Sequence, residues 1–124
     1  MRFWIALAAV FGGTSVAMGA FAAHGLQGAL AGERIDWLET ASNYAMAHAL
    51  ALLGVAWLSE RRGGFAIHVA GAGFAVGVIL FSGGLYLAAL ADLRDIMPVV
   101  PLGGMAFLAG WAALLVAGLR RPSG

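Results

Sequence analysis

Four stretches of this chain carry no charged side chain, and together they make up most of its length. They cover residues 3–32, 40–59, 63–91 and 96–119, which are 30, 20, 29 and 24 residues long. About 20 apolar helical residues, each rising 1.5 Å, cross the ~30 Å hydrocarbon core of a bilayer. A soluble helical protein of this size would need charges along every helix. The pattern therefore predicts an integral membrane protein with four spans.

Composition limits what else the chain can contain. It has 124 residues, of which 62% are hydrophobic and 10% charged, so four spans leave one domain (1–124) and no room for a soluble catalytic module. A net charge of +1 excludes nucleic acid as a partner, because phosphate binding needs a clustered basic face. The absence of cysteine excludes disulfides, thiolate metal sites and a cysteine nucleophile.

The predicted fold is an all-α membrane protein, an antiparallel bundle of four transmembrane helices. We expect the helices at about residues 3–23, 36–58, 65–91 and 98–119, with helix 2 beginning outside the membrane among acidic residues that suit a helix N-terminus. A cleaved signal peptide ending near Met18-Gly19-Ala20 is the alternative for the first stretch. Its apolar run is longer than a usual signal core, so we expect it to be retained as a helix.

The arginines predict the orientation. In a four-span chain the termini and the middle turn share one side, and that side carries Arg2, Arg61, Arg62, Arg120 and Arg121. The other side carries only two arginines, at positions 34 and 94. By the positive-inside rule, both termini are expected in the cytoplasm.

Small residues four apart predict how the helices pack, because lipid supplies no hydrophobic force between them. The motif Gly73-Phe74-Ala75-Val76-Gly77 is a literal GxxxG. Such faces either pack within the bundle or make a homo-oligomer, for which Gly73/Gly77 is the first candidate. The paired glycines of the last two helices allow close approach or leave space for a bound group. The predicted packing glycines are Gly12, Gly19, Gly73, Gly77, Gly83, Gly84, Gly103 and Gly104.

Polar residues gather in the half of the bundle away from the termini, and intramembrane polar groups tend to face a bundle interior or a cavity. The candidate ligand-binding cluster is His24, Asn43, Tyr44, His48, Ser82 and Tyr86. The plainer alternatives are interface tyrosines, a helix-capping His24 and a Ser82 that bonds the carbonyl of Val78 one turn back. His48 lies deep in a hydrophobic helix, so it needs a partner, for which His24, Asn43 or Tyr86 are the candidates.

Other chemistry is poorly supported. Beyond His24 and His48, no third histidine, cysteine or buried carboxylate has metal-ligand spacing, so we expect no metal or cofactor. Ser82 has no adjacent base on its helix, and an intramembrane acidic residue of the kind that proton-coupled carriers use is absent.

Several motifs together are specific to one family. The segment Gly19-Ala20-Phe21-Ala22-Ala23-His24-Gly25-Leu26 resembles the GAFGAHGL signature of the domain of unknown function 423 family, which includes the eukaryotic transmembrane protein 256. Further matches are residues 44–50, 81–86 and 101–104, followed by Gly110-Trp111. Gly84 departs from the family, which often has Ser there. The resemblance implies a small inner-membrane protein with four helices and implies no activity.

Two functions are consistent with these observations. The first is a non-enzymatic bundle that associates with itself or with another membrane protein. The alternative is a pocket open to the outer side that binds a small molecule or lipid, with a role as a transport accessory among the functions this would allow. A membrane enzyme in which His48 and Tyr86 move protons is a third hypothesis. Membrane lipid is the expected surrounding partner in every case.

Overall fold

The protein is a bundle of four membrane-spanning helices, which confirms the predicted all-α fold class. The computed structural model describes residues 1–25 and 28–120. The helices long and apolar enough to cross a membrane are Arg2–Gly25, Gly32–Arg61, Phe65–Ala91 and Arg94–Leu119. Two positions used in the sequence reasoning, Leu26 and Arg121, lie outside the described residues.

Two of the spans change their winding partway along. The first consists of α1 (Arg2–Ala20) and the π-helical η1 (Phe21–Gly25), and the third of α3 (Phe65–Gly77), the π-helical η2 (Val78–Ser82) and α4 (Gly83–Ala91). The second is the uninterrupted α2 (Gly32–Arg61), and the fourth consists of the short 3₁₀ segment η3 (Arg94–Ile96) and α5 (Val99–Leu119). The segment η1 falls within a motif that suggested the family, and the end of η2 overlaps another, the motif at residues 81–86. Such π turns are frequent at functional sites.

Helix α2 begins earlier than the sequence predicted. Its first residue is Gly32 rather than position 36, because the Ala31 carbonyl already accepts hydrogen bonds from the backbone N–H groups of Arg34 and Ile35 at 3.0 and 3.1 Å. The acidic residues that marked the predicted start therefore lie in the first turns of the helix. This places Arg34 on α2, where its side chain can reach the neighbouring helix.

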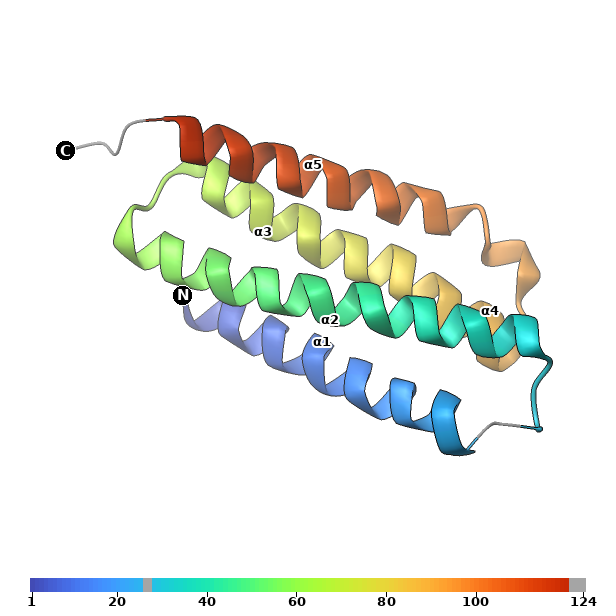
Figure 1. Cartoon of the computed structure of the whole chain (residues 1–124). Coiled ribbons are helices and arrows are strands. Elements are labelled where there is room, and N and C mark those ends of the chain that lie inside the picture. The colour runs from blue at the N-terminus through green and yellow to red at the C-terminus, as the bar shows by residue number, and fades with distance from the viewer. Residues whose placement is uncertain (26–27, 121–124) are drawn as a thin grey trace.

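The helices run antiparallel, and α2 is the central element (Figure 1). It packs against α1 on one side and against α3 and α4 on the other, while α5 packs mainly on α3. The start of α1, the α2–α3 turn and the end of α5 share one end of the bundle, here called the terminal end (Figure 1). The opposite end, here called the loop end, holds η1, the start of α2, and η3.

Glycines let α3 and α5 approach each other closely. A Cβ atom at Gly73 would lie 2.8 Å from both the Ala106 carbonyl oxygen and the Gly110 Cα atom, and one at Gly77 would overlap the Phe107 ring. Close backbone packing of this kind is what holds helices together in lipid. The Gly73/Gly77 face is thus occupied by α5 of the same chain, so it is not open to a second copy.

The first span is held differently and lies at the edge of the bundle. Only 17% of its apolar stretch is buried inside the bundle, against 50% for the third span. A Cβ atom at Gly12 would lie 3.7 Å from the Ala49 Cβ atom, and one at Gly19 would lie 3.8 Å from the Ser42 Cβ atom, so both glycines face α2 at ordinary contact distance. Much of the outward face of α1 is therefore available to lipid or to another helix.

Candidate functional site in the membrane interior

His48 lies near the middle of α2 in an aromatic box. Its side chain is only 5% exposed, and its ring stacks on that of Phe107, with centroids 3.7 Å apart and planes 12° apart. The rings of Tyr44, Phe74 and Trp111 complete the box, with centroids 6.2, 5.5 and 5.8 Å from that of His48. These rings come from α2, α3 and α5, so the box joins three helices.

Both nitrogens of His48 are engaged. Nδ1 lies 2.7 Å from the Tyr44 carbonyl oxygen, and the Trp111 indole N–H donates to Nε2 at 3.0 Å. A carbonyl only accepts and an indole only donates, so the imidazole is neutral with its proton on Nδ1. The expected partners His24, Asn43 and Tyr86 are therefore wrong, because the second partner of His48 is on α5. This leaves neither ring nitrogen free to bind a metal ion.

A second polar group, here called the serine ladder, ties α1 and the third span to α2. The Ser15 hydroxyl donates to the Ser42 carbonyl at 2.6 Å, and the Ser82 hydroxyl donates to the Ala41 carbonyl at 2.8 Å. The hydroxyls of Ser42 and Tyr86 lie 3.0 Å apart and share a hydrogen bond. The expected bond from Ser82 to the Val78 carbonyl is thus replaced by a bond between helices.

The six predicted site residues therefore separate into different environments. Tyr44 and His48 belong to the aromatic box, whereas Ser82 and Tyr86 belong to the serine ladder. Asn43 and His24 are exposed. In η1 it is Ala22 that is fully buried, while His24 lines a surface hollow with Ala17, Ala20, Phe21 and Gly25.

Sequence reasoning did not single out several residues that complete these groups. The sequence does not distinguish Ser42 as a site residue, because the adjacent Asn43 is the more polar candidate. Phe107 looks like an ordinary lipid-facing aromatic in the last stretch, and Trp111 entered only through the family resemblance, with no partner predicted for it. His68 also bonds across helices, because its Nδ1 accepts a hydrogen bond from the Trp4 indole N–H at 3.3 Å.

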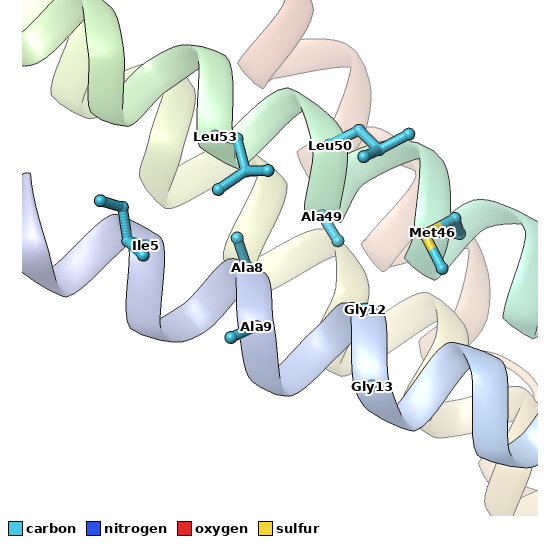
Figure 2. Close-up of a pocket in the computed structure, with 9 residues that line it drawn as sticks. All are labelled: Ile5, Ala8, Ala9, Gly12, Gly13, Met46, Ala49, Leu50 and Leu53. Carbon is cyan, nitrogen blue, oxygen red and sulfur yellow. The ribbon is translucent and has the colours of Figure 1, made fainter.

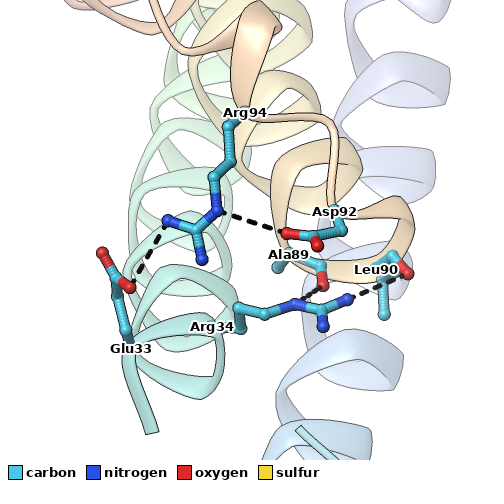
Figure 3. A network of polar contacts seen from close by, with 6 residues as sticks. All are labelled: Glu33, Arg34, Ala89, Leu90, Asp92 and Arg94. Carbon is cyan, nitrogen blue, oxygen red and sulfur yellow. Dashed lines mark hydrogen bonds and ion pairs between the residues drawn. The ribbon is translucent and has the colours of Figure 1, made fainter. Parts of the chain in front are cut away.

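A network of polar contacts made by charged side chains lies at the loop end of the bundle (Figure 3). Arg34 of α2 donates through Nε to the Ala89 carbonyl at 2.6 Å and through Nη2 to the Leu90 carbonyl at 3.4 Å. These are among the last carbonyls of α4, which otherwise lack partners inside the helix and carry partial negative charge. Arg94 pairs with Glu33 at 3.5 Å and Asp92 at 3.3 Å, at the exposed surface.

Two grooves flank α1 within the membrane. One groove has a volume of about 310 Å³ and lies between α1 and α2. Figure 2 shows that its α1 wall consists largely of small residues. The groove is lined by Ile5, Ala8, Ala9, Gly12, Gly13, Met46, Ala49, Leu50 and Leu53. The other, here called the tyrosine cleft, has a volume of about 290 Å³ and lies between α1 and the third span. It is lined by Val10, Phe11, Thr14, Ala45, Val78, Ile79, Gly83 and Tyr86.

Two further observations concern metal ligands and the Ser82 hydroxyl. In residues 1–25 and 28–120, no three His, Cys, Asp or Glu side chains come close enough together to hold a metal ion. The Ser82 hydroxyl is turned onto a backbone carbonyl rather than toward a base. A nucleophile needs a base within hydrogen-bond reach, which this geometry does not give to Ser82.

Comparison with known proteins agrees with the resemblance found in the sequence. The family model described as "Protein of unknown function (DUF423)" matches residues 18–104. The UPF0382 inner membrane protein YgdD of Escherichia coli K12 is 41% identical over 119 residues, which cover 96% of this chain and 91% of that protein. The UPF0382 membrane protein YwdK of Bacillus subtilis is 35% identical, with 97% of this chain and 98% of that protein covered.

A staphylococcal relative extends the same match. The UPF0382 membrane protein SH2409 of Staphylococcus haemolyticus is 40% identical over 94% of this chain and 94% of its own length. No solved structure matches this chain. The matched segment includes both π-helical segments, His48, and three residues of the serine ladder, Ser42, Ser82 and Tyr86. The chain therefore belongs to the DUF423 family of multi-pass membrane proteins, whose members named above are called UPF0382 proteins.

Proposed function

We propose that this protein is a non-enzymatic component of the bacterial inner membrane that associates with a further transmembrane helix, first of all that of a second copy, through the exposed face of α1. One observation carries the proposal. Residues Ala9, Gly13 and Ala17 are exposed at four-residue spacing, and a Cβ atom at Gly13 would meet nothing within 4 Å. Small residues four apart are what helices use to approach each other in lipid.

The neighbouring surface of α2 extends this face. Beside the small residues of α1 lie Met46, Leu50 and Leu53 of α2, which form the other wall of the groove in Figure 2. A helix laid along α1 would therefore meet a flat stripe of small side chains bordered by larger apolar ones. The GxxxG motif of α3 is already covered by α5, which makes α1 the better supported face for association.

The chain's lack of cysteine allows a clean crosslinking test in native membranes. Single cysteines at Ala9→Cys and Ala17→Cys are expected to give disulfide-linked dimers on oxidation. Leu108→Cys on α5, where Leu108 is 65% exposed, serves as the matched control and is expected to stay monomeric. Crosslinking at positions 9 and 17 no greater than at 108 would refute association through α1.

The identity of the partner follows from the product of the same experiment. A product of twice the mass of the 12.7 kDa chain indicates a second copy. A product of any other mass indicates a different membrane protein, which would contradict self-association while retaining the α1 face. A Gly13→Leu substitution, which places a large side chain in the middle of the stripe, is expected to abolish either product.

In the proposed orientation both termini face the cytoplasm. The terminal end carries Arg2, Arg61, Arg62 and Arg120 among the described residues, and the Arg61 guanidinium lies 5.3 Å from the Trp57 ring centre, as expected of an interfacial aromatic. In whole cells, a membrane-impermeant maleimide is expected to label Asp95→Cys and not Glu60→Cys. The reverse labelling would overturn the orientation without affecting the α1 proposal.

A further inference from the structure

Within the part of the chain that the structure describes, the serine ladder contains one hydroxyl proton without an acceptor. Ser42 and Tyr86 together carry two hydroxyl protons, and their mutual hydrogen bond uses one of them. Among the described residues, neither hydroxyl has another side-chain or backbone acceptor. Either hydroxyl can donate in that bond. When Ser42, which is 6% exposed, is the donor, the second proton belongs to Tyr86, a residue that lines the tyrosine cleft.

A second hydroxyl lines the same cleft. Thr14 is exposed on α1, and within residues 1–25 and 28–120 its hydroxyl has no hydrogen-bond partner. A threonine inside a helix ordinarily bonds a carbonyl one turn back. An unpaired O–H group is costly in hydrocarbon, because lipid tails supply no acceptor. The cleft thus presents two hydroxyl donors and only apolar side chains besides.

These properties define the ligand that the cleft accepts. Among the described residues, no charged side chain lines the cleft, so the acceptor is a neutral oxygen rather than a phosphate. Its space of about 290 Å³ accommodates roughly ten groups of the size of a water molecule, at ~30 Å³ each. Tyr86 lies five residues before the end of α4 at Ala91, about 7.5 Å along the helix axis from the loop end.

We propose that the tyrosine cleft binds one membrane glycerolipid from the leaflet at the loop end. Its acyl chain fills the space between α1 and η2, and an ester carbonyl accepts a hydrogen bond from the Tyr86 hydroxyl. Ester groups lie at the border of the hydrocarbon core, which is the depth expected of Tyr86. This site is on the flank of α1 opposite the groove of Figure 2, so it is independent of the α1 association face.

The test compares lipid retention by chains purified in mild detergent, measured by native mass spectrometry. We expect the wild type to retain one glycerolipid, and Tyr86→Phe to hold it roughly three- to fifteen-fold less tightly, the range for one hydrogen bond in a membrane protein. Tyr44→Phe, which removes the other tyrosine hydroxyl, is the matched control and is expected to retain the lipid.

Two further variants separate lipid binding from a structural role. Tyr86→Phe and Ser42→Ala both remove the Ser42–Tyr86 hydrogen bond, but Ser42→Ala leaves the Tyr86 proton free for the lipid, so its retention is expected to equal or exceed that of the wild type. Gly83→Leu is expected to fill the cleft and release the lipid, whereas Gly54→Leu, where nothing lies within 4 Å, is expected to retain it.

The proposal is overturned by any of three results. The first is a wild-type chain with no more bound glycerolipid than Gly83→Leu. The second is equal loss of lipid in Ser42→Ala and Tyr86→Phe, which would indicate a structural role for that bond. The third is recovery of a different carbonyl compound, such as an isoprenoid quinone, in place of a glycerolipid. None of these outcomes alters the crosslinking expected at Ala9 and Ala17.

Discussion

Replacing Gly73 by alanine tests the contact on which the α3–α5 half of the bundle depends. The added Cβ atom would lie 2.8 Å from the Ala106 carbonyl oxygen and 2.8 Å from the Cα and N atoms of Gly110. Real Cβ atoms essentially never approach other atoms within 3.0 Å. Since all these neighbours are backbone atoms, no side-chain rotation can relieve the overlap. The two helices must move apart.

The expected cost follows from two opposing effects. Forcing a methyl group into a well-packed interface costs about 1–3 kcal/mol, and we take the upper part of that range because the neighbours are backbone. Alanine favours the helix over glycine by up to about 1 kcal/mol, which offsets part of the cost. We therefore expect Gly73→Ala to lower the free energy of unfolding by about 1–2 kcal/mol.

Gly54→Ala on α2 is the matched control. A Cβ atom there meets nothing within 4 Å, so only the helix preference remains and the variant is expected to be up to about 1 kcal/mol more stable than the wild type. Reversible unfolding in mixed micelles, followed by tryptophan fluorescence, measures both variants. A Gly73→Ala protein as stable as Gly54→Ala would refute the close approach of α3 and α5.

Two further predictions concern polar contacts. Trp111→Phe removes the donor to His48 Nε2 and is expected to lower the free energy of unfolding by about 0.6–1.7 kcal/mol. The control is Trp57→Phe, which is expected to change that free energy little because Trp57 is 58% exposed. Equal effects of the two substitutions would contradict the Trp111–His48 bond. Arg34→Met removes charge-assisted hydrogen bonds to the end of α4 and is expected to lower the free energy of unfolding by about 1.5–3 kcal/mol. Arg94→Met removes only exposed ion pairs and is expected to lower it by at most about 1 kcal/mol. Unfolding of both arginine variants is measured at low and high salt, and a larger effect at position 94 would contradict the capping role of Arg34.

The candidate site shows which parts of a polar cluster can be predicted from spacing. Tyr44 and His48 are four residues apart on an uninterrupted helix, and they do share a face. Depth in the bundle, rather than spacing, led us to expect His24 in the same cluster, although η1 is wound as a π helix and His24 lies exposed. An inserted residue in a helical turn shifts the following residues by about 100°, one residue's share of a turn, and nothing in a 3.6-residue pattern signals it.

The helical periodicity of the sequence does not identify which residues on different helices form hydrogen bonds with each other. Ser82 was equally able to bond the Val78 carbonyl on its own helix, and the choice of Ala41 on α2 depends on how closely the helices pack. The partner of His48 is Trp111, 63 residues away, in a stretch whose residues look alike to a hydropathy analysis. Such pairs depend on helix rotation, which the residues of a single helix do not specify.

The sequence by itself determined that four helices cross the membrane, where they turn, and which ends share a side, because the cost of placing charge or unpaired backbone in hydrocarbon acts on each segment separately. Only the tertiary structure decided that α5 covers the GxxxG face of α3, that α1 remains largely exposed, and that the polar side chains divide between an aromatic box and a serine ladder. Those outcomes follow from how small side chains let neighbouring backbones approach, and that fit exists only once the helices are assembled.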